Sequence, residues 1–205
     1  MENSIYGPYR DILPRIKDDF TERIRTFQRL EKEHTGYKIC EHLLSRVKSE
    51  ESMRQKLEKR GLKADYKNAL TQIKDSIGIR IVCDFIDDIY KNVENLKNLS
   101  GVSVHEEKDY IHHAKPNGYR SYHMILVSEE PFGDVYGNTP GEFFIEVQLR
   151  TIAMDTWAAL EHQIKYKKLI KNQNLITGEL KRCADELASC DLSMQTLRNL
   201  IRESE

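Results

Sequence analysis

The chain of 205 residues has no long apolar run and almost no excess of either charge. Its 32 Lys and Arg stand against 33 Asp and Glu, so the whole surface is not a polycation for duplex nucleic acid. No apolar run approaches the ~20 residues that cross a bilayer, and the first residues, MENSIYGPYRD, do not form a secretion signal. We therefore expect a cytoplasmic protein without a membrane partner, in which any basic site is local.

Cysteine is scarce, and its four positions, Cys40, Cys83, Cys183 and Cys190, form no C-x-x-C pair. This spacing excludes a zinc ribbon and a thioredoxin-type motif, and free thiols in a reducing compartment are expected. Neither a G-x-x-x-x-G-K-[ST] loop nor a G-x-G-x-x-G loop is present. If a nucleotide binds, side chains must hold its phosphates.

Helical periodicity is strong at both ends of the chain. Spacings of three and four predict a long amphipathic helix through Ile12, Ile16, Phe20, Ile24, Phe27 and Leu30. A second helical stretch is expected over residues 39–47. The segment KSEESMRQKLEKRG predicts a helix that is capped by Ser49 and ends at Gly61. A short helix is expected over 68–74 and a final one over 178–202.

The middle of the chain is strand-like. IGIRIVCDF, VSVHEEKDYI, SYHMILVS and FFIEVQLR are typical of strands, and IDDIYKNVENLKNL predicts a crossover helix. In the last strand Ile145, Val147 and Leu149 alternate with Glu146, Gln148 and Arg150, and Thr151 can cap the helix that follows. We predict one α+β domain over 1–205, a mixed sheet flanked by N- and C-terminal helices. Its parts would be helical 1–44, a catalytic core 45–168 and a C-terminal helix 169–205.

One local basic cluster stands out between Arg46 and Lys63, where seven cations meet three carboxylates. On a helix, Ser52, Lys56 and either Lys59 or Arg60 fall on one face. A hydroxyl followed by cations suits a polyphosphate chain. The alternative is an ordinary solvated helix face.

Two carboxylates are candidates for a divalent cation. Asp75 precedes the strand IGIRIV, and Glu146 lies in mid-strand on the same face as Gln148. Carboxylates that project from a sheet toward one point suit Mg²⁺. A turn residue and a solvent-facing strand residue are the simpler explanations, and spacing alone does not bring the two together.

The segment HHAKPNGYRSYH places an aromatic ring and several cations around a Pro-Asn-Gly turn. Tyr119 could stack on a base, while Lys115, Arg120 and His123 could meet phosphates. An ordinary hairpin turn with a packed tyrosine is the alternative. The adjacent histidines before the turn have no second ligand set with zinc spacing.

Together, HHAKPNGYRSYH, EVQLRTIAMDTWAALEH and RVKSEESMRQKLEKRG resemble the RelA/SpoT-type synthetase domain, and more narrowly the small alarmone synthetases of the RelQ or RelP group. The resemblance covers roughly residues 45–168. It implies a mixed sheet related to nucleotidyltransferases. It also implies transfer of the β,γ-pyrophosphate of ATP to the 3′-hydroxyl of GDP or GTP, which makes ppGpp or pppGpp.

The resemblance also implies roles for single residues. ATP would be held by Arg46 and Arg80 at the adenine and by Lys48, Ser52, Lys56 and Lys59 or Arg60 at the phosphates. Asp75 would bind Mg²⁺, and Glu146 would bind or face the metal and activate the acceptor hydroxyl. The guanosine nucleotide would stack on Tyr119 and meet Lys115, Arg120, His123 and Gln148.

Two other functions compete with this one. A toxin-like relative would pyrophosphorylate the 3′ end of tRNA, and a decayed synthetase fold would only bind nucleotide or RNA. The joint presence of Asp75, Glu146 and Tyr119 argues against decay, and the near-neutral charge argues against tRNA. No His-Asp hydrolase motif is found, so we expect synthesis without degradation. The terminal helices and the resemblance imply a homotetramer. GDP or GTP preference, and regulation by RNA or by alarmone, stay open.

Overall fold

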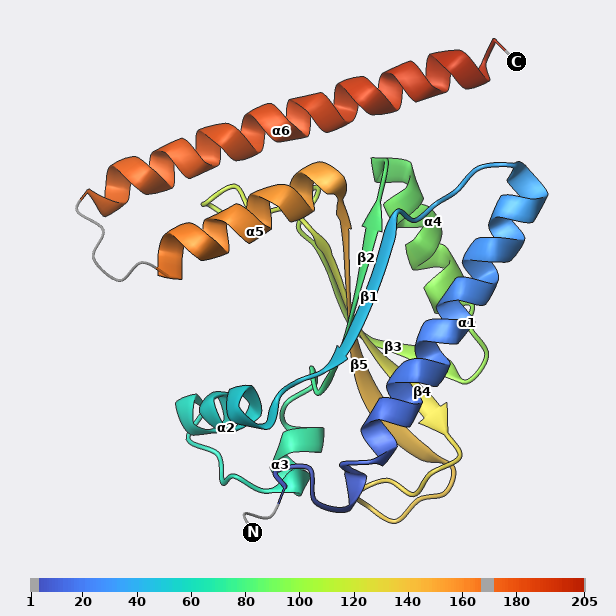
Figure 1. Cartoon of the computed structure of the whole chain (residues 1–205), viewed down its shortest axis with the longest axis vertical. Helices are drawn as coiled ribbons and strands as arrows, with labels where there is room; N and C mark the ends of the chain where they lie inside the picture. The colour runs from blue at the N-terminus through green and yellow to red at the C-terminus, as the bar shows by residue number, and fades with distance from the viewer. Residues whose placement is uncertain (1–3, 167–171, 205) are drawn as a thin grey trace.

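The structure, a computed structural model, describes residues 4–166 and 172–204. Its centre is a five-stranded mixed sheet in the order β1-β2-β5-β4-β3 (Figure 1). The strands are β1 (His42–Val47), β2 (Ile77–Cys83), β3 (Val102–Asp109), β4 (Tyr122–Glu130) and β5 (Gly141–Thr151). β2 and β5 are parallel and every other pair is antiparallel. The α+β fold expected from the sequence is confirmed.

Helices cover one face of the sheet and leave the other open (Figure 1). α1 (Ile12–Thr35) and α4 (Ile86–Lys97) pack on the covered face, and a short 3₁₀ helix, η1 (Gly7–Tyr9), precedes them. α2 (Glu50–Lys59) and α3 (Tyr66–Thr71) connect β1 to β2. α5 (Ile152–Tyr166) follows β5, and α6 (Gln173–Arg202) contacts α5 across the end of the sheet.

The covered face holds the hydrophobic core. Ile16, Phe20 and Ile24 of α1 are completely buried and join one cluster with Ile79 and Ile145 of the two parallel strands. Burying such side chains stabilises the fold by about 1.5–3 kcal/mol each. The core therefore fixes the sheet from one side and leaves polar side chains of the same strands on the other.

The expected helix over 39–47 is wrong, because His42–Val47 forms the edge strand β1. The spacing of Leu43 and Val47 suits a helix, but both are only half-buried and alternate with exposed positions. Pairing with β2 satisfies this backbone and overrides the local pattern. The helical segment predicted over 1–44 thus ends in a strand. The last helix begins at Gln173, before the predicted residue 178.

Other local predictions are confirmed. Ser49 caps α2 by accepting a hydrogen bond from the backbone of Ser52, and Gly61 follows the helix with a φ of 66°. In the same way Thr151 caps α5 by accepting from Met154. All four cysteines are free. Within 4–166 and 172–204, no helix combines the length and apolar character that a membrane span requires.

Candidate active site

The open face of the sheet collects the predicted site residues in two cross-strand rows. Glu146 on β5 pairs with Gly78 on β2 and with Ile125 on β4. One row away, Gln148 pairs with Arg80 and with His123. Directly paired residues point to the same face, so β5 places Glu146 and Gln148 between two groups of side chains.

A cavity of about 180 Å³ lies on the β1–β2 side of Glu146. Its lining includes Arg46, Lys48, Asp75, Arg80, Glu146 and Gln148. Gly78 forms part of the floor, and a Cβ added there would meet only the side chain of Arg46, at 4.0 Å. Glycine therefore leaves open the space between Arg46 and Glu146, and a larger side chain would fill the cavity.

Asp75 sits at this cavity between two lysines. Its Oδ2 atom lies 3.0 Å from Lys48 Nζ and 2.5 Å from Lys56 Nζ. Burial by itself would raise the pKa of Asp75, but the hydrogen bonds and charges of Lys56 and Lys48 outweigh it and hold the pKa below its usual value. The other carboxylate oxygen, Oδ1, is buried without a protein partner. The carboxylate is thus charged and half satisfied.

The pKa of Glu146 is shifted in the opposite direction from that of Asp75. Burial raises its pKa, and the nearby negative charge of Asp75 raises it further. The charges of Lys56 and Lys48 and a hydrogen bond from Gln148 Nε2, 3.1 Å from Glu146 Oε2, only partly compensate. Asp75 and Glu146 therefore lie close enough for the charge of one to shift the pKa of the other. Sequence spacing alone did not predict that the two carboxylates lie together. Two carboxylates with opposed pKa shifts are typical of a catalytic pair.

The arrangement fits a magnesium ion in part. Asp75 Oδ1 is an unpartnered anionic oxygen, and Glu146 supplies a second carboxylate nearby. No cluster of three His, Cys, Asp or Glu residues that could hold a metal occurs in the described part of the chain. Mg²⁺ commonly takes one or two carboxylates and completes its octahedron with phosphate oxygens and water. The pair suits an ion that arrives with a polyphosphate.

A second cavity, of about 140 Å³, lies on the β3–β4 side of Glu146. It is lined by Glu106, Lys108, Tyr110, Lys115, His123, Ile125 and Glu146. Glu146 thus lines both cavities, and the central strand separates them. Lysines at this second cavity could hold an anion beside that carboxylate.

Tyr119 does not line this cavity itself, but a directed chain of hydrogen bonds holds it against His123, which does. Its hydroxyl accepts from Arg150 Nη2 at 2.8 Å and therefore donates to His123 Nε2 at 2.7 Å. Burial, and then the charges of Arg150, Lys115 and Lys108, lower the pKa of His123 to about 4. His123 is neutral near pH 7, with its proton on Nδ1, which agrees with an accepting Nε2.

The ring of Tyr119 lies in an aromatic and cationic surrounding. Lys115 Nζ is 4.8 Å from its centroid and 4.5 Å from that of Tyr110, and the Trp157 ring lies 6.3 Å away. Tyr119 and Lys115 therefore lie next to each other, as the sequence predicted. A purine stacking on this face of Tyr119 would replace the Lys115 ammonium, and the lysine would then be released toward phosphate.

Six predicted nucleotide ligands line neither cavity: Ser52, Lys56, Lys59, Arg60, Tyr119 and Arg120. Lys56 still contacts Asp75, and Tyr119 still contacts His123. Arg120 donates to Asp185 on α6 at 3.1 Å and does not line the second cavity with Lys115 and His123. Arg60 donates to the backbone carbonyl of Gln72 at 3.1 Å, and Lys59 is exposed; neither lines the first cavity. The structure therefore groups Lys48 and Lys56, but not Lys59, Arg60 or Arg120, with the carboxylates.

A polar link between the two cavities was not predicted from the sequence. Asp155 Oδ1 accepts from Arg80 Nη1 at 3.2 Å and from Arg150 Nη1 at 2.9 Å. Arg150, which is 6% exposed, also contacts Tyr119 and Gln148 Oε1. Alternation along β5 placed Arg150 on the same face as Glu146, and that was the available signal. Asp155, in the first turn of α5, gave none.

Comparison with known proteins places this geometry in a family. The family described as "Region found in RelA / SpoT proteins" matches residues 45–171. The GTP pyrophosphokinase YwaC of Bacillus subtilis is 43% identical over 150 residues, which cover 73% of this chain and 70% of YwaC. The GTP pyrophosphokinase YjbM of the same organism is 31% identical over 198 residues, 97% of this chain and 89% of YjbM.

Solved structures of small alarmone synthetases have the same fold as this chain. Small alarmone synthetase 2 from Bacillus subtilis superposes with a TM-score of 0.75 at 36% identity, over 93% of this chain and 98% of that one. Small alarmone synthetase 1 from the same organism, bound to its product pppGpp, superposes with a TM-score of 0.78 at 26% identity, over 92% and 94%. Because the family model matches residues 45–171, more than half of the chain, and the fold is shared with these structures, this chain belongs to the RelA/SpoT family.

Proposed function

We infer that this chain is a (p)ppGpp synthetase, which transfers the β,γ-pyrophosphate of ATP to the 3′-hydroxyl of GDP or GTP. The observation that carries this inference is the position of Glu146, which lines both the first cavity, with Arg46, Lys48 and Arg80, and the second cavity, with Lys108 and Lys115. Two relatives bear the name GTP pyrophosphokinase, and one structural neighbour is bound to pppGpp.

The first cavity is the proposed ATP site. Lys48 and Lys56 would neutralise the phosphates, and the N-terminal turn of α2, with the Ser52 hydroxyl, would donate hydrogen bonds to anionic oxygens. Arg46 and Arg80 project from β1 and β2 and would flank the adenine. Transfer of this kind depends on positioning and charge neutralisation more than on covalent chemistry, which is what such a set of cations supplies.

Mg²⁺ is the proposed cofactor, held by Asp75 with phosphate oxygens and water, and Glu146 would bind or face it. When bound it would offset negative charge on the moving pyrophosphate. Before ATP arrives, Lys48 and Lys56 neutralise Asp75. Binding of the metal to Asp75 would free both ammonium groups for the phosphates, so one carboxylate organises the cations of the site.

The second cavity is the proposed acceptor site. Tyr119 would stack on guanine, and Lys115, His123 and Gln148 would contact the rest of the nucleotide. A free carboxylate with a raised pKa is a better proton acceptor, so Glu146 suits the role of base toward the 3′-hydroxyl. The lining includes Tyr110, Lys108 and Lys115, so an aromatic ring and two cations are available to a guanosine nucleotide beside Glu146.

Transfer of label distinguishes the acceptors. With γ-labelled ATP and Mg²⁺, the label is expected to move to GDP or GTP, and the product should migrate as ppGpp or pppGpp. Deacylated tRNA in a parallel reaction serves as the competing acceptor. If label accumulates on tRNA while GDP and GTP stay unmodified, the toxin-like function replaces the one proposed here.

Glu146→Gln is expected to lower turnover on the order of a hundredfold or more, because the amide keeps the shape but loses charge and basicity. The wild-type pH profile of kcat/KM should show an acid limb above the usual glutamate range, since activity is lost as the raised pKa of Glu146 is crossed from above. Rates measured under saturating ATP from pH 5 to 9 would show both effects.

The matched control is Glu142→Gln, which makes the same change at an exposed position on the same strand, outside both cavities. It should leave turnover and the pH profile unchanged. Near-normal turnover in a folded Glu146→Gln protein would remove this carboxylate from the mechanism.

We further propose that copies of the chain assemble into a homotetramer in the cytoplasm, as the resemblance to small alarmone synthetases implies. Large apolar side chains on α6 support an association: Leu192, Met194, Leu197, Leu200 and Ile201 are all more than half exposed. Light scattering at micromolar concentration is expected to give four times the chain mass of 24.0 kDa. A monomer in that experiment would end the proposal.

A further inference from the structure

The loop between β3 and β4, residues 110–121, presses its backbone directly on α6. Gly118 lies at the contact with a φ of 90°, and a Cβ added there would be 2.5 Å from Ala184 Cβ and 3.2 Å from Lys181 Cα. Both the backbone conformation and the space thus demand glycine. The backbone of this acceptor loop is therefore in direct contact with the C-terminal helix at Gly118.

Arg120 joins the same two elements through its guanidinium group. Nη1 donates to the carbonyls of Gly118, at 3.2 Å, and of Ala184, at 3.4 Å, while Nη2 donates to Asp185 Oδ1 at 3.1 Å. The side chain is 20% exposed, and it does not line the acceptor cavity. Its charge is therefore used to tie the loop to the helix.

The residue between Gly118 and Arg120 is Tyr119, the proposed base platform. The loop also reaches α5 through Asn117, which donates to Glu161 and accepts from the backbone of Tyr119. The ring of Trp157 faces Tyr119 and donates to the Leu180 carbonyl of α6 at 2.8 Å. The backbone and the ring of Tyr119 are thus held by elements that rest on α6.

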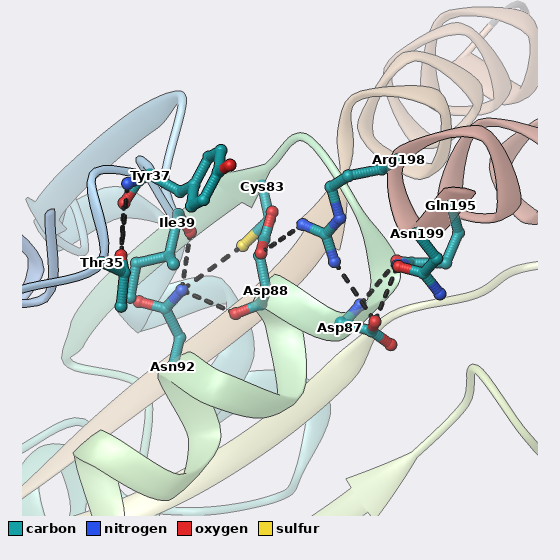
Figure 2. A network of polar contacts seen from close by, with 10 residues as sticks. All are labelled: Thr35, Tyr37, Ile39, Cys83, Asp87, Asp88, Asn92, Gln195, Arg198 and Asn199. Atoms are coloured by element: carbon teal, nitrogen blue, oxygen red, sulfur yellow. Dashed lines mark hydrogen bonds and ion pairs between the residues drawn. The ribbon is translucent and has the colours of Figure 1, made fainter. Parts of the chain in front are cut away.

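The far half of α6 is itself anchored to the body of the protein. Arg198 donates to Asp88 at 2.7 Å and to Asp87 at 3.2 Å, and Gln195 exchanges hydrogen bonds with Asp87 (Figure 2). Closer to the loop, Thr151 at the end of β5 donates to Asp191 at 2.6 Å. With polar contacts along its length, α6 is a fixed support and not a loose tail.

We propose that α6 positions the acceptor loop, and that Arg120 and Asp185 are positioning residues for the guanosine nucleotide and do not bind its phosphates. The inference rests on the proposed function, because it assigns a task to the acceptor site. A stacking platform binds best when its orientation exists before the ligand arrives, since no ordering cost is then subtracted from affinity. Loosening the Arg120–Asp185 contact should therefore weaken acceptor binding and leave the ATP site unaffected.

A double-mutant cycle tests the proposal. Arg120→Gln and Asp185→Asn should each raise the KM for GDP about three- to tenfold, as expected for coupled contacts. The KM for GDP of the double variant should be no higher than that of Arg120→Gln alone, because both substitutions remove the same Arg120–Asp185 contact. The KM for ATP and kcat at saturating GDP should stay within about twofold of wild type in all three proteins.

The alternatives predict other patterns. If Arg120 binds acceptor phosphate directly, Arg120→Gln will raise the KM for GDP whether or not Asp185 is present, and Asp185→Asn alone will leave it unchanged. That outcome overturns the proposal, as does an unchanged KM for GDP in every variant of an active enzyme. If the wild-type protein makes no alarmone, the proposed function itself is wrong. That result is seen before any variant is compared, so the two failures are distinguishable.

Two further variants complete the experiment. Glu186→Gln, one residue along α6, makes the same type of change at an exposed carboxylate that pairs with Arg182, and it should leave the KM for GDP unchanged. Ala184→Val enlarges the side chain that meets Gly118, so it should raise the KM for GDP without any change in charge. An unchanged KM for GDP in a folded Ala184→Val protein would contradict the proposal that α6 positions the acceptor loop.

Discussion

The two halves of the site meet at the carboxylate of Glu146, which lines both cavities. β5 lies between β2 and β4, so its open-face side chains have the basic donor cavity on one side and the acceptor cavity on the other. The position is fixed from behind, because Ile145 and Val147, the neighbours of Glu146 in the strand, are completely buried in the core. A shift of one residue in this register would turn the carboxylate into the core, which burial of the other face forbids.

Charge gives the site its chemistry. The same two lysines lie near Asp75 and Glu146, yet the pKa values of these carboxylates shift in opposite directions. Asp75 has direct ion pairs with the lysines, while Glu146 is half-buried and their charges compensate its burial only in part. This difference suits one carboxylate to hold a cation and the other to accept a proton. On the acceptor side, neutral His123 and cationic Arg150 fix the hydroxyl of Tyr119 from two directions, so the ring is oriented before a base arrives.

The sequence predicted the parts of this site that depend on local chemistry. The cap at Ser49 and the alternation of β5 could be found because hydrogen bonding and burial leave a regular pattern within a few residues. β1 was mistaken for a helix because its edge pairing with β2 is a long-range contact. The direction of Arg120 depends on α6, more than sixty residues later, and the role of Asp155 depends on two arginines from different strands. Such contacts leave no trace in spacing.

Simultaneous binding of the two nucleotides tests the central claim most directly. Equilibrium titration with a non-hydrolysable ATP analogue and GDP should show one molecule of each per active site, bound together and without mutual displacement. Gly78→Leu, which fills the donor cavity, should abolish binding of the analogue and spare GDP, whereas Tyr119→Ala should weaken GDP by about 1–3 kcal/mol and spare the analogue. Competition of the two nucleotides for a single site, or loss of both in either variant, would contradict a carboxylate placed between two separate cavities.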